Sequence, residues 1–464
     1  MRVFALTVGL GVLLAAGAGS AADERRSESA ARLATPTSAL ARAITPARLR
    51  AHLAALQAIA RRNGGTRAVG TAGYAQSVAY VVRKLRAAGY RPRLQTFSFD
   101  FFRETKPPVL ERLKPATRRY TKGTDFLVMR YSGGGNVTAR IVPVHNTSAS
   151  SGCSASDFAG FPGGAIALMK RGECPFTQKA RNAEAAGAAV ALIANDGTPG
   201  RTAPLMATLF ATVRIPVLIL SSAAAADLDP SSTVHVELSV STRTARAANV
   251  IADLPGRQGG VVLLGGHLDS VASGPGINDN GSGSALVLEV ARQARRLHVR
   301  PRHGLRFAFW GGEELGLLGS RSYVQSLSGR QRSRILDVLN FDMVGSPNFG
   351  RIVYTGDGAP RGSVRIENAF RAYFASRGLP VEEESLGGAS DHASFATAGI
   401  PVGGLFTGAD EPKSADMARR FGGKAGTSLD ACYHKACDTV ANVDFGILGQ
   451  MADAGAVVAV RLAG

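Results

Sequence analysis

Apolar positions recur along this chain at two spacings, one typical of helices and one of strands. Over residues 45–59 and 74–88 they recur at helical spacing, with Thr-Pro opening the first segment and Gly89 ending the second. The stretch YRPRLQTFSF that follows alternates as a strand does. Residues 23–44 are rich in Ala, Arg and Ser and carry few large apolar side chains, so we expect a flexible propeptide or linker there.

Two further regions differ in how strands and helices alternate. Residues 104–245 carry short β-like runs separated by turns, such as GNVTARIVPV, AAVALIAND and TVHVELSV, with one helical segment at 179–186. Beyond them, the strand-like runs VVLLGG, LRFAFW and DVLNFDMV are separated by helical patterns over 283–297 and 317–325. Regular alternation of this kind predicts an α/β fold with a mostly parallel sheet flanked by helices.

The predicted domain organisation is one α/β domain interrupted by an insertion. We expect residues 45–103 and 246–464 to form the α/β domain and residues 104–245 to form a mostly β domain inserted into it. Functional sites in such open sheets lie at the carboxyl ends of the strands.

The N-terminus predicts export. Residues 1–22 combine Met-Arg, a short apolar run and small residues, as a secretory signal peptide does. The run is too short and too poorly flanked for a stable membrane anchor, and no later stretch is long and apolar enough to span a bilayer. We therefore expect a soluble, secreted, extracellular protein.

Four cysteines in an exported chain indicate two disulfides, for which three pairings are possible. The local pairing is favoured: Cys153 with Cys174, and Cys432 with Cys437. The second of these would close a very small loop that contains a tyrosine and a histidine.

A formal net charge of +19 raises the question of a nucleic-acid partner. The basic residues are mostly arginines scattered along the chain, with neither a Lys/Arg block nor an aromatic-interleaved basic strip. We therefore interpret the charge as a solvated surface and expect no nucleic acid among the partners.

The stretch FAFWGGEELGLLGS, residues 307–320, ends an apolar strand on two glycines and two adjacent carboxylates, Glu313 and Glu314. One interpretation is the acidic start of a helix, because carboxylates favour the positive end of the helix dipole. The other is a site at the end of the strand, which requires partners elsewhere in the chain.

Potential partners for the two glutamates lie at or after the ends of other strand-like runs, and one more lies within the small cysteine loop. Each alone has an ordinary alternative: a hydrogen-bonded histidine, a turn residue, a buried carboxylate or a surface loop. Together with Glu314 they provide two histidines and three carboxylates, which suits two zinc ions sharing one bridging carboxylate. These candidate ligands are His267, Asp279, Glu314, Asp342 and His434.

From about residue 45 to its end, the chain resembles the secreted di-zinc aminopeptidases of the aminopeptidase Y family (metallopeptidase family twenty-eight). The motifs SDH at 390–392, GLFTGA from 404 and CYHKACDT from 432 carry the resemblance, together with the order of the candidate ligands. The insertion resembles the protease-associated domain through RGECPFTQKARNAEAAGAAVALIAND. This resemblance implies the zinc exopeptidase fold and cleavage of the N-terminal residue from peptides that have a free N-terminus.

The resemblance also implies a role for each ligand. Asp279 would bridge the two zinc ions, His267 and Asp342 would complete one site, and Glu314 and His434 the other.

Three further residues acquire roles from the same resemblance. Glu313 would be the general base, Tyr433 would donate its hydroxyl to the developing oxyanion, and Asp269 would hydrogen-bond His267 and fix its tautomer.

One departure from the family concerns the residue before the Ser-Asp-His motif, where related bacterial enzymes often have arginine and this chain has Ala389. The departure leaves the preferred N-terminal residue open, although an apolar one is expected. Asp391 and His392 are expected to support the site rather than to react. Calcium binds some relatives, but its ligands cannot be placed here, and a monomer is expected.

Other functions are less consistent with these residues. Glutaminyl cyclases share the architecture with one zinc, which the presence of both His267 and Asp342 argues against. Glutamate carboxypeptidases usually add a helical dimerisation domain for which this chain has no room. Receptor-like relatives have lost their metal ligands, whereas this chain has every candidate ligand. Neither a Gly-x-Ser-x-Gly elbow nor a His-Glu-x-x-His helix occurs in the sequence.

Overall fold

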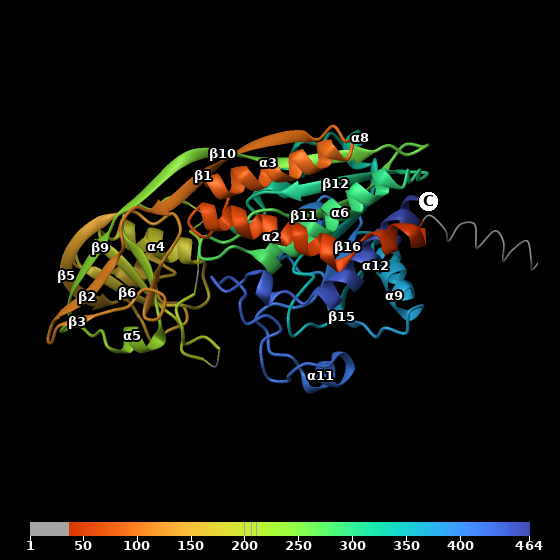
Figure 1. The fold of residues 1–464 in the computed structure, drawn as a ribbon. Coiled ribbons are helices and arrows are strands. Elements are labelled where there is room, and N and C mark those ends of the chain that lie inside the picture. Colours follow the sequence, from red (N-terminus) through yellow and green to blue (C-terminus); the bar gives the residue numbers. More distant parts are fainter. Residues whose placement is uncertain (1–36, 199, 206, 210) are drawn as a thin grey trace, which may run out of the picture. The chain divides into compact units, whose positions relative to one another are not determined.

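The computed structural model describes residues 37–198, 200–205, 207–209 and 211–464. They form two compact units: the residues up to Phe97 together with Arg246–Gly464, and Ser98–Ala245 (Figure 1). The chain passes between the units within two long strands, β1 (Arg93–Glu104) and β10 (Val240–Leu254). The expected signal peptide and the first part of the expected propeptide lie outside the described residues.

The first unit is built on an eight-stranded sheet in the order β1-β10-β12-β11-β13-β16-β14-β15. Its centre, β12-β11-β13-β16, is parallel, and β10 and β14 join it as antiparallel neighbours of β12 and β16. The mostly parallel α/β sheet expected from the sequence is therefore confirmed. The strands are β11 (Val261–His267), β12 (Gly304–Trp310), β13 (Ile335–Phe341), β14 (Ile352–Thr355), β15 (Glu382–Ser385) and β16 (Val402–Phe406).

Helices cover both faces of this sheet, which explains why its central strands are mostly apolar. On one face α6 and α12 pack against β11 and β12, and α12 also packs against α2 and α9. On the opposite face Tyr323 of α7 and Phe395 of α10 contact Trp310 of β12. The helices are α2 (Pro46–Arg62), α3 (Ala72–Ala87), α6 (Gly283–Arg296), α7 (Leu318–Ser326), α8 (Gly329–Arg332), α9 (Ser363–Ala375), α10 (His392–Ala396), α11 (Ala415–Phe421) and α12 (Phe445–Ala463).

Helix α2 begins where the sequence predicts. The Thr45 side chain accepts a hydrogen bond from the Arg48 backbone N–H, and Pro46 occupies the first helical position. The preceding segment differs from expectation: residues 37–43 are helical, and Leu40 and Ile44 are buried. Burial of these two apolar side chains orders a segment whose overall composition had indicated a flexible linker.

Helix α12 corrects a second expectation. It is 19 residues long and apolar enough to cross a membrane by length and composition, although no such stretch was expected after the N-terminus. Its apolar side chains, Leu448 and Met451 among them, are instead buried inside the first unit. The helix also carries Gln450, Asp453 and Arg461, and the burial of its apolar side chains is that of a core helix.

The second unit is mostly β, as expected, with strands in the order β3-β2-β9-β5-β6-β7-β8-β4. A disulfide between Cys153 and Cys174 links two loops, with a Cα–Cα distance of 5.7 Å. The main elements are β2 (Val109–Lys114), β3 (Arg118–Arg119), β4 (Phe126–Val128), β5 (Gly135–Pro143), β6 (Ile166–Lys170), α4 (Phe176–Ala185), β7 (Val190–Ala194), β8 (Val217–Leu220), α5 (Ser222–Ala226) and β9 (Thr233–Leu238).

A buried polar network joins α2, α3 and α6 of the first unit. His52 Nε2 lies 2.9 Å from Glu289 Oε2, and its Nδ1 lies 2.7 Å from the Tyr80 hydroxyl oxygen. Burial lowers the pKa of His52, although Glu289 opposes that shift. The neutral imidazole fits this environment, because it can donate to the carboxylate and accept from the tyrosine.

The lowered pKa of His52 predicts a dependence of stability on pH. As the pH falls through about 6.5, the unfolded chain takes up a proton at this histidine that the folded chain does not, so the folded state is destabilised. His52→Gln should therefore lose less stability than wild type between about pH 7.5 and 5.5, measured as the shift of the urea midpoint. His235→Gln, which changes a histidine of the second unit, serves as control. Equal pH dependence in wild type and His52→Gln would contradict the prediction.

Candidate active site

The site lies at the carboxyl ends of three parallel strands. His267 is the last residue of β11, and Asp342 directly follows β13. Glu313 and Glu314 follow β12 after two glycines and form a short 3-10 turn. Because these strands are neighbours in the sheet, their ends deliver the side chains to one place.

The two glycines are required for different reasons. A Cβ on Gly311 would lie 2.0 Å from the Tyr74 hydroxyl oxygen, and Gly312 has a φ of +71°. The helix after the glutamates begins only at Leu318. The two carboxylates thus begin a single 3-10 turn rather than the α-helix that follows it.

Asp279 lies in the loop between β11 and α6, within the segment η2 (Ile277–Ser282), where its own backbone is not helical (φ −105°, ψ 93°). Asp438 holds this loop: its two carboxylate oxygens accept from the backbone N–H groups of Asn278, at 2.7 Å, and of Asp279, at 3.0 Å. The backbone around Asp279 is therefore fixed independently of its carboxylate.

His434 is carried by the loop that the Cys432–Cys437 disulfide closes, with a Cα–Cα distance of 5.3 Å. Its backbone has a φ of +58°, and its carbonyl accepts a hydrogen bond from the Ser273 hydroxyl at 2.8 Å. The Tyr433 ring stacks on the imidazole with 3.8 Å between ring centroids. Both disulfides are the local pairs favoured from the sequence.

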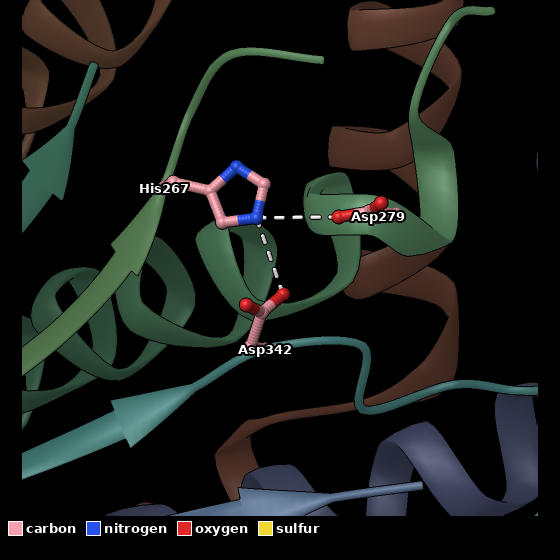
Figure 2. A group of neighbouring side chains, drawn as sticks. All are labelled: His267, Asp279 and Asp342. Carbon is pink, nitrogen blue, oxygen red and sulfur yellow. Dashed lines mark hydrogen bonds and ion pairs between the residues drawn. The ribbon is translucent and has the colours of Figure 1, made fainter. Parts of the chain in front are cut away.

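Asp279 connects two clusters of side chains. Its Oδ1 lies 3.2 Å from His267 Nε2, which is also 3.2 Å from Asp342 Oδ1 (Figure 2). Its Oδ2 lies 3.1 Å from His434 Nε2, which is also 3.1 Å from Glu314 Oε2. Within each cluster the potential ligand atoms lie within 4.8 Å of one another. Each oxygen of one carboxylate therefore faces a different histidine.

The charges in the clusters suit bound cations. Burial raises the pKa of Glu314 to about 7. Burial acts to lower the pKa of His434, but hydrogen bonds with Asp279 and Glu314 raise it to about 10. Both groups bind a metal ion only in their deprotonated forms, so binding of a divalent cation here would release protons. The donor set of imidazole nitrogen and carboxylate oxygen fits zinc.

Glu313 belongs to neither cluster. Its Oε2 lies 3.9 Å from His267 Nε2, and its backbone N–H donates to Asp269 Oδ1 at 3.3 Å. Burial raises the pKa of Glu313 well above its usual range. The structure thus separates the two adjacent glutamates, one directed at His434 and the other beside His267.

The contacts of Asp269 differ in detail from the expected ones. Its carboxylate oxygen Oδ1 lies 3.7 Å from His267 Nδ1, which exceeds ordinary hydrogen-bond distance. The backbone carbonyl of Asp269 is closer to the same nitrogen, at 3.2 Å. The orientation of His267 is therefore set by the main chain, and the carboxylate of Asp269 holds Glu313.

The Ser-Asp-His motif lies beside the cluster. Ser390 Oγ donates to Asp342 Oδ2 at 2.6 Å, and His392 Nε2 lies 2.6 Å from the Leu386 carbonyl. Asp391 is buried, and burial raises its pKa to about 7. The motif therefore supports Asp342 and the adjoining loop.

A pocket of about 620 Å³ opens over both clusters. Its wall includes the apolar side chains of Met343, Leu386 and Phe406 and the carboxylates of Glu384 and Glu411. A volume of this size accommodates a few residues of a peptide.

Two residues that position the site were not singled out from the sequence. Arg67 is fully buried, its Nε donates to the Pro275 carbonyl at 2.8 Å, and its guanidinium also contacts the carbonyls of Leu268 and Gly276. It therefore holds the segment that leads from His267 towards Asp279. Nothing in the local sequence distinguishes Arg67 from other arginines. The second residue, Asp438, stands next to Cys437, and this position is a signal by which it could have been found.

A mostly parallel α/β sheet thus carries, at its strand ends and in two adjoining loops, two histidine–carboxylate clusters that could each hold a metal ion. The chain belongs to peptidase family M28: the pattern of that family matches residues 249–459, and the PA-domain pattern matches residues 137–228. The family resemblance noted in the motifs and in the inserted domain is thus confirmed.

Known relatives agree with this assignment. The chain is 43% identical to an aminopeptidase of Pseudomonas aeruginosa (strain UCBPP-PA14) over 421 residues, 87% of this chain and 78% of that protein. It is similar to the structure of an aminopeptidase from Aneurinibacillus sp. strain AM-1, with a TM-score of 0.74, 26% identity and 92% and 96% of the two chains covered. BSAP, a zinc aminopeptidase from Bacillus subtilis, gives a TM-score of 0.70 at 26% identity over 90% and 95% of the chains.

Proposed function

We propose that this peptidase is an exported aminopeptidase that removes N-terminal residues from peptides by means of two zinc ions. The observation that carries the proposal is the geometry of Asp279, whose two oxygens face His267 and His434 separately. One zinc would be held by His267, Asp279 and Asp342, and the other by Asp279, Glu314 and His434. The aminopeptidase relatives and the zinc named for the Bacillus subtilis structure support this choice.

The chemistry that bound zinc supplies is polarisation of the scissile carbonyl and a lowered pKa of the attacking water. Glu313 removes the proton from this water and returns it to the leaving amine. Burial raises the pKa of Glu313, which makes its carboxylate a stronger base for the first transfer. Burial also raises the pKa of Tyr433, so its hydroxyl keeps its proton and can donate to the developing oxyanion.

The pocket indicates which N-terminal residues fit. Met343, Leu386 and Phe406 offer apolar contacts to the side chain of the first residue. The carboxylates around the site attract the positively charged α-amino group and repel an acidic side chain. We therefore propose a preference for apolar over acidic N-terminal residues.

Export is proposed on independent grounds. Both disulfides require an oxidising compartment, and the first 22 residues resemble a signal peptide.

The test is hydrolysis of leucine-p-nitroanilide by the full chain. We expect release of p-nitroaniline, loss of activity after removal of metal by a chelator, and its recovery on addition of zinc, with metal content read by elemental analysis. N-acetyl-leucine-p-nitroanilide, which lacks the free amino group, should be cleaved at least about 100-fold more slowly, equivalent to about 2.7 kcal/mol. Equal cleavage of both substrates, or full activity in zinc-free protein, would rule out this function.

A further inference from the structure

A second cavity of about 770 Å³ lies in the first unit, lined by residues other than those of the metal pocket. The ends of α3 and α6 and the segment after α6 surround it, with one side chain from α2. Among the described residues that line it, none is acidic and six are basic: Arg48, Arg292, Arg295, Arg296, His298 and Arg300.

Three of the guanidinium groups are held in place. Arg292 Nη1 donates to Glu289 Oε2 at 2.6 Å. Arg296 Nε donates to Oε1 of Gln293 at 2.5 Å, and Gln293 is 1% exposed. Arg295 donates to the Gly89 carbonyl at 3.1 Å and lies over the Tyr90 ring, at 5.4 Å from its centroid. These contacts use only some of the five N–H donors of each side chain.

The charge of the cavity is not balanced locally. Glu289, which is fully buried, lies 2.6 Å from Arg292 and 3.9 Å from Arg48, and it also hydrogen-bonds His52. Five arginines and this one carboxylate leave a formal surplus of four positive charges, with His298 neutral.

Interaction with helix dipoles accounts for only part of this arrangement. Arg295 and Arg296 lie in the last turn of α6, where cations are favourable. Arg48 instead lies in the first turn of α2, where the dipole disfavours a cation, and Arg300 lies beyond the end of α6. The helix dipoles therefore do not account for these two exposed arginines.

We propose that this cavity binds a small polyanion that carries two or more phosphate groups. The planar guanidinium group pairs with phosphate through two parallel hydrogen bonds, and a ligand with several phosphates can match four surplus charges. The volume lies in the range of ordinary small-molecule sites. The phosphates can belong to a free compound or to the headgroup of a lipid.

The test measures binding of inorganic tripolyphosphate to the full chain by calorimetry at low ionic strength. The variant Arg296→Gln/Arg300→Gln removes two charges from the cavity, and Arg330→Gln/Arg361→Gln removes two charges from exposed sites elsewhere. The cavity variant should bind at least about tenfold more weakly than wild type, whereas the control should stay within about twofold, because only the former loses direct phosphate contacts. Unchanged thermal midpoints without ligand would show that both variants fold.

A parallel measurement separates the two phosphate sources. Vesicles with cardiolipin, which carries two phosphates, are compared with vesicles of phosphatidylcholine alone, for wild type and both variants. Cavity-dependent binding of tripolyphosphate identifies a free ligand, and cavity-dependent binding of cardiolipin vesicles alone identifies a headgroup. Equal weakening in both variants, equal affinity for citrate, or no binding of either probe would overturn the proposal.

Discussion

Glu313→Gln is expected to lower kcat for N-terminal amide hydrolysis by about 100- to 10,000-fold, the usual contribution of a general base. Glutamine has nearly the same shape but cannot take up the proton of the attacking water. Because Glu313 belongs to neither ligand cluster, the variant should retain the zinc content of wild type. Steady-state kinetics and elemental analysis of the same preparation measure both quantities.

The neighbouring residue provides the control. Glu314 Oε2 lies 3.1 Å from His434 Nε2, so Glu314→Gln should lose activity together with the zinc at that position. Loss of zinc from Glu313→Gln, or retention of most of its activity, would contradict the proposed roles of Glu313 as general base and Glu314 as metal ligand.

Asp279→Asn is expected to remove at least one metal ion, to weaken binding of the other and to reduce activity below about one-thousandth of wild type, since metal polarisation supplies several kcal/mol. An asparagine has one carbonyl oxygen, so it can serve only one of the two histidines that Asp279 faces, and its NH₂ group confronts the other. The hydrogen bonds from the backbone of this loop to Asp438 do not involve the altered side chain. Folding should therefore persist.

Zinc per chain is the decisive measurement for this variant. Asp342→Asn, in which the altered side chain belongs to a single cluster, should lose one zinc and retain the other. If Asp279→Asn still holds two zinc ions at the wild-type affinity, the bridging role is wrong.

The sequence was most informative where a potential metal ligand stands at the end of a periodic apolar run. His267 and Asp342 end apolar strands of a regular strand–helix alternation, so their convergence followed from the rule for parallel sheets. Asp279 and His434 lie in loops; their residue types made them candidate ligands, and the family resemblance gave each of them its role. Their positions depend on contacts between residues far apart in the chain, such as the hydrogen bonds of Asn278 and Asp279 to Asp438.

Which side chains are buried was harder to predict from the sequence than which side chains could bind a metal ion. Arg67 looks like any solvated arginine in the sequence, but three backbone carbonyls around it replace water. Residues 37–43 show the same difficulty, because composition describes the average of a segment and two well-placed apolar side chains, Leu40 and Ile44, determine its order.

The Cys432–Cys437 disulfide closes the loop that carries His434, so completion of the site depends on the oxidation state of these two cysteines. A chain still in a reducing compartment lacks the Cys432–Cys437 bond, so the segment bearing His434 and Tyr433 is free to open. We expect this reduced chain to fold but to lack peptidase activity, because its second metal position is incomplete. If the protein is exported as proposed, this bond would form only after the chain leaves the reducing compartment in which it is made, so the complete site would arise outside that compartment.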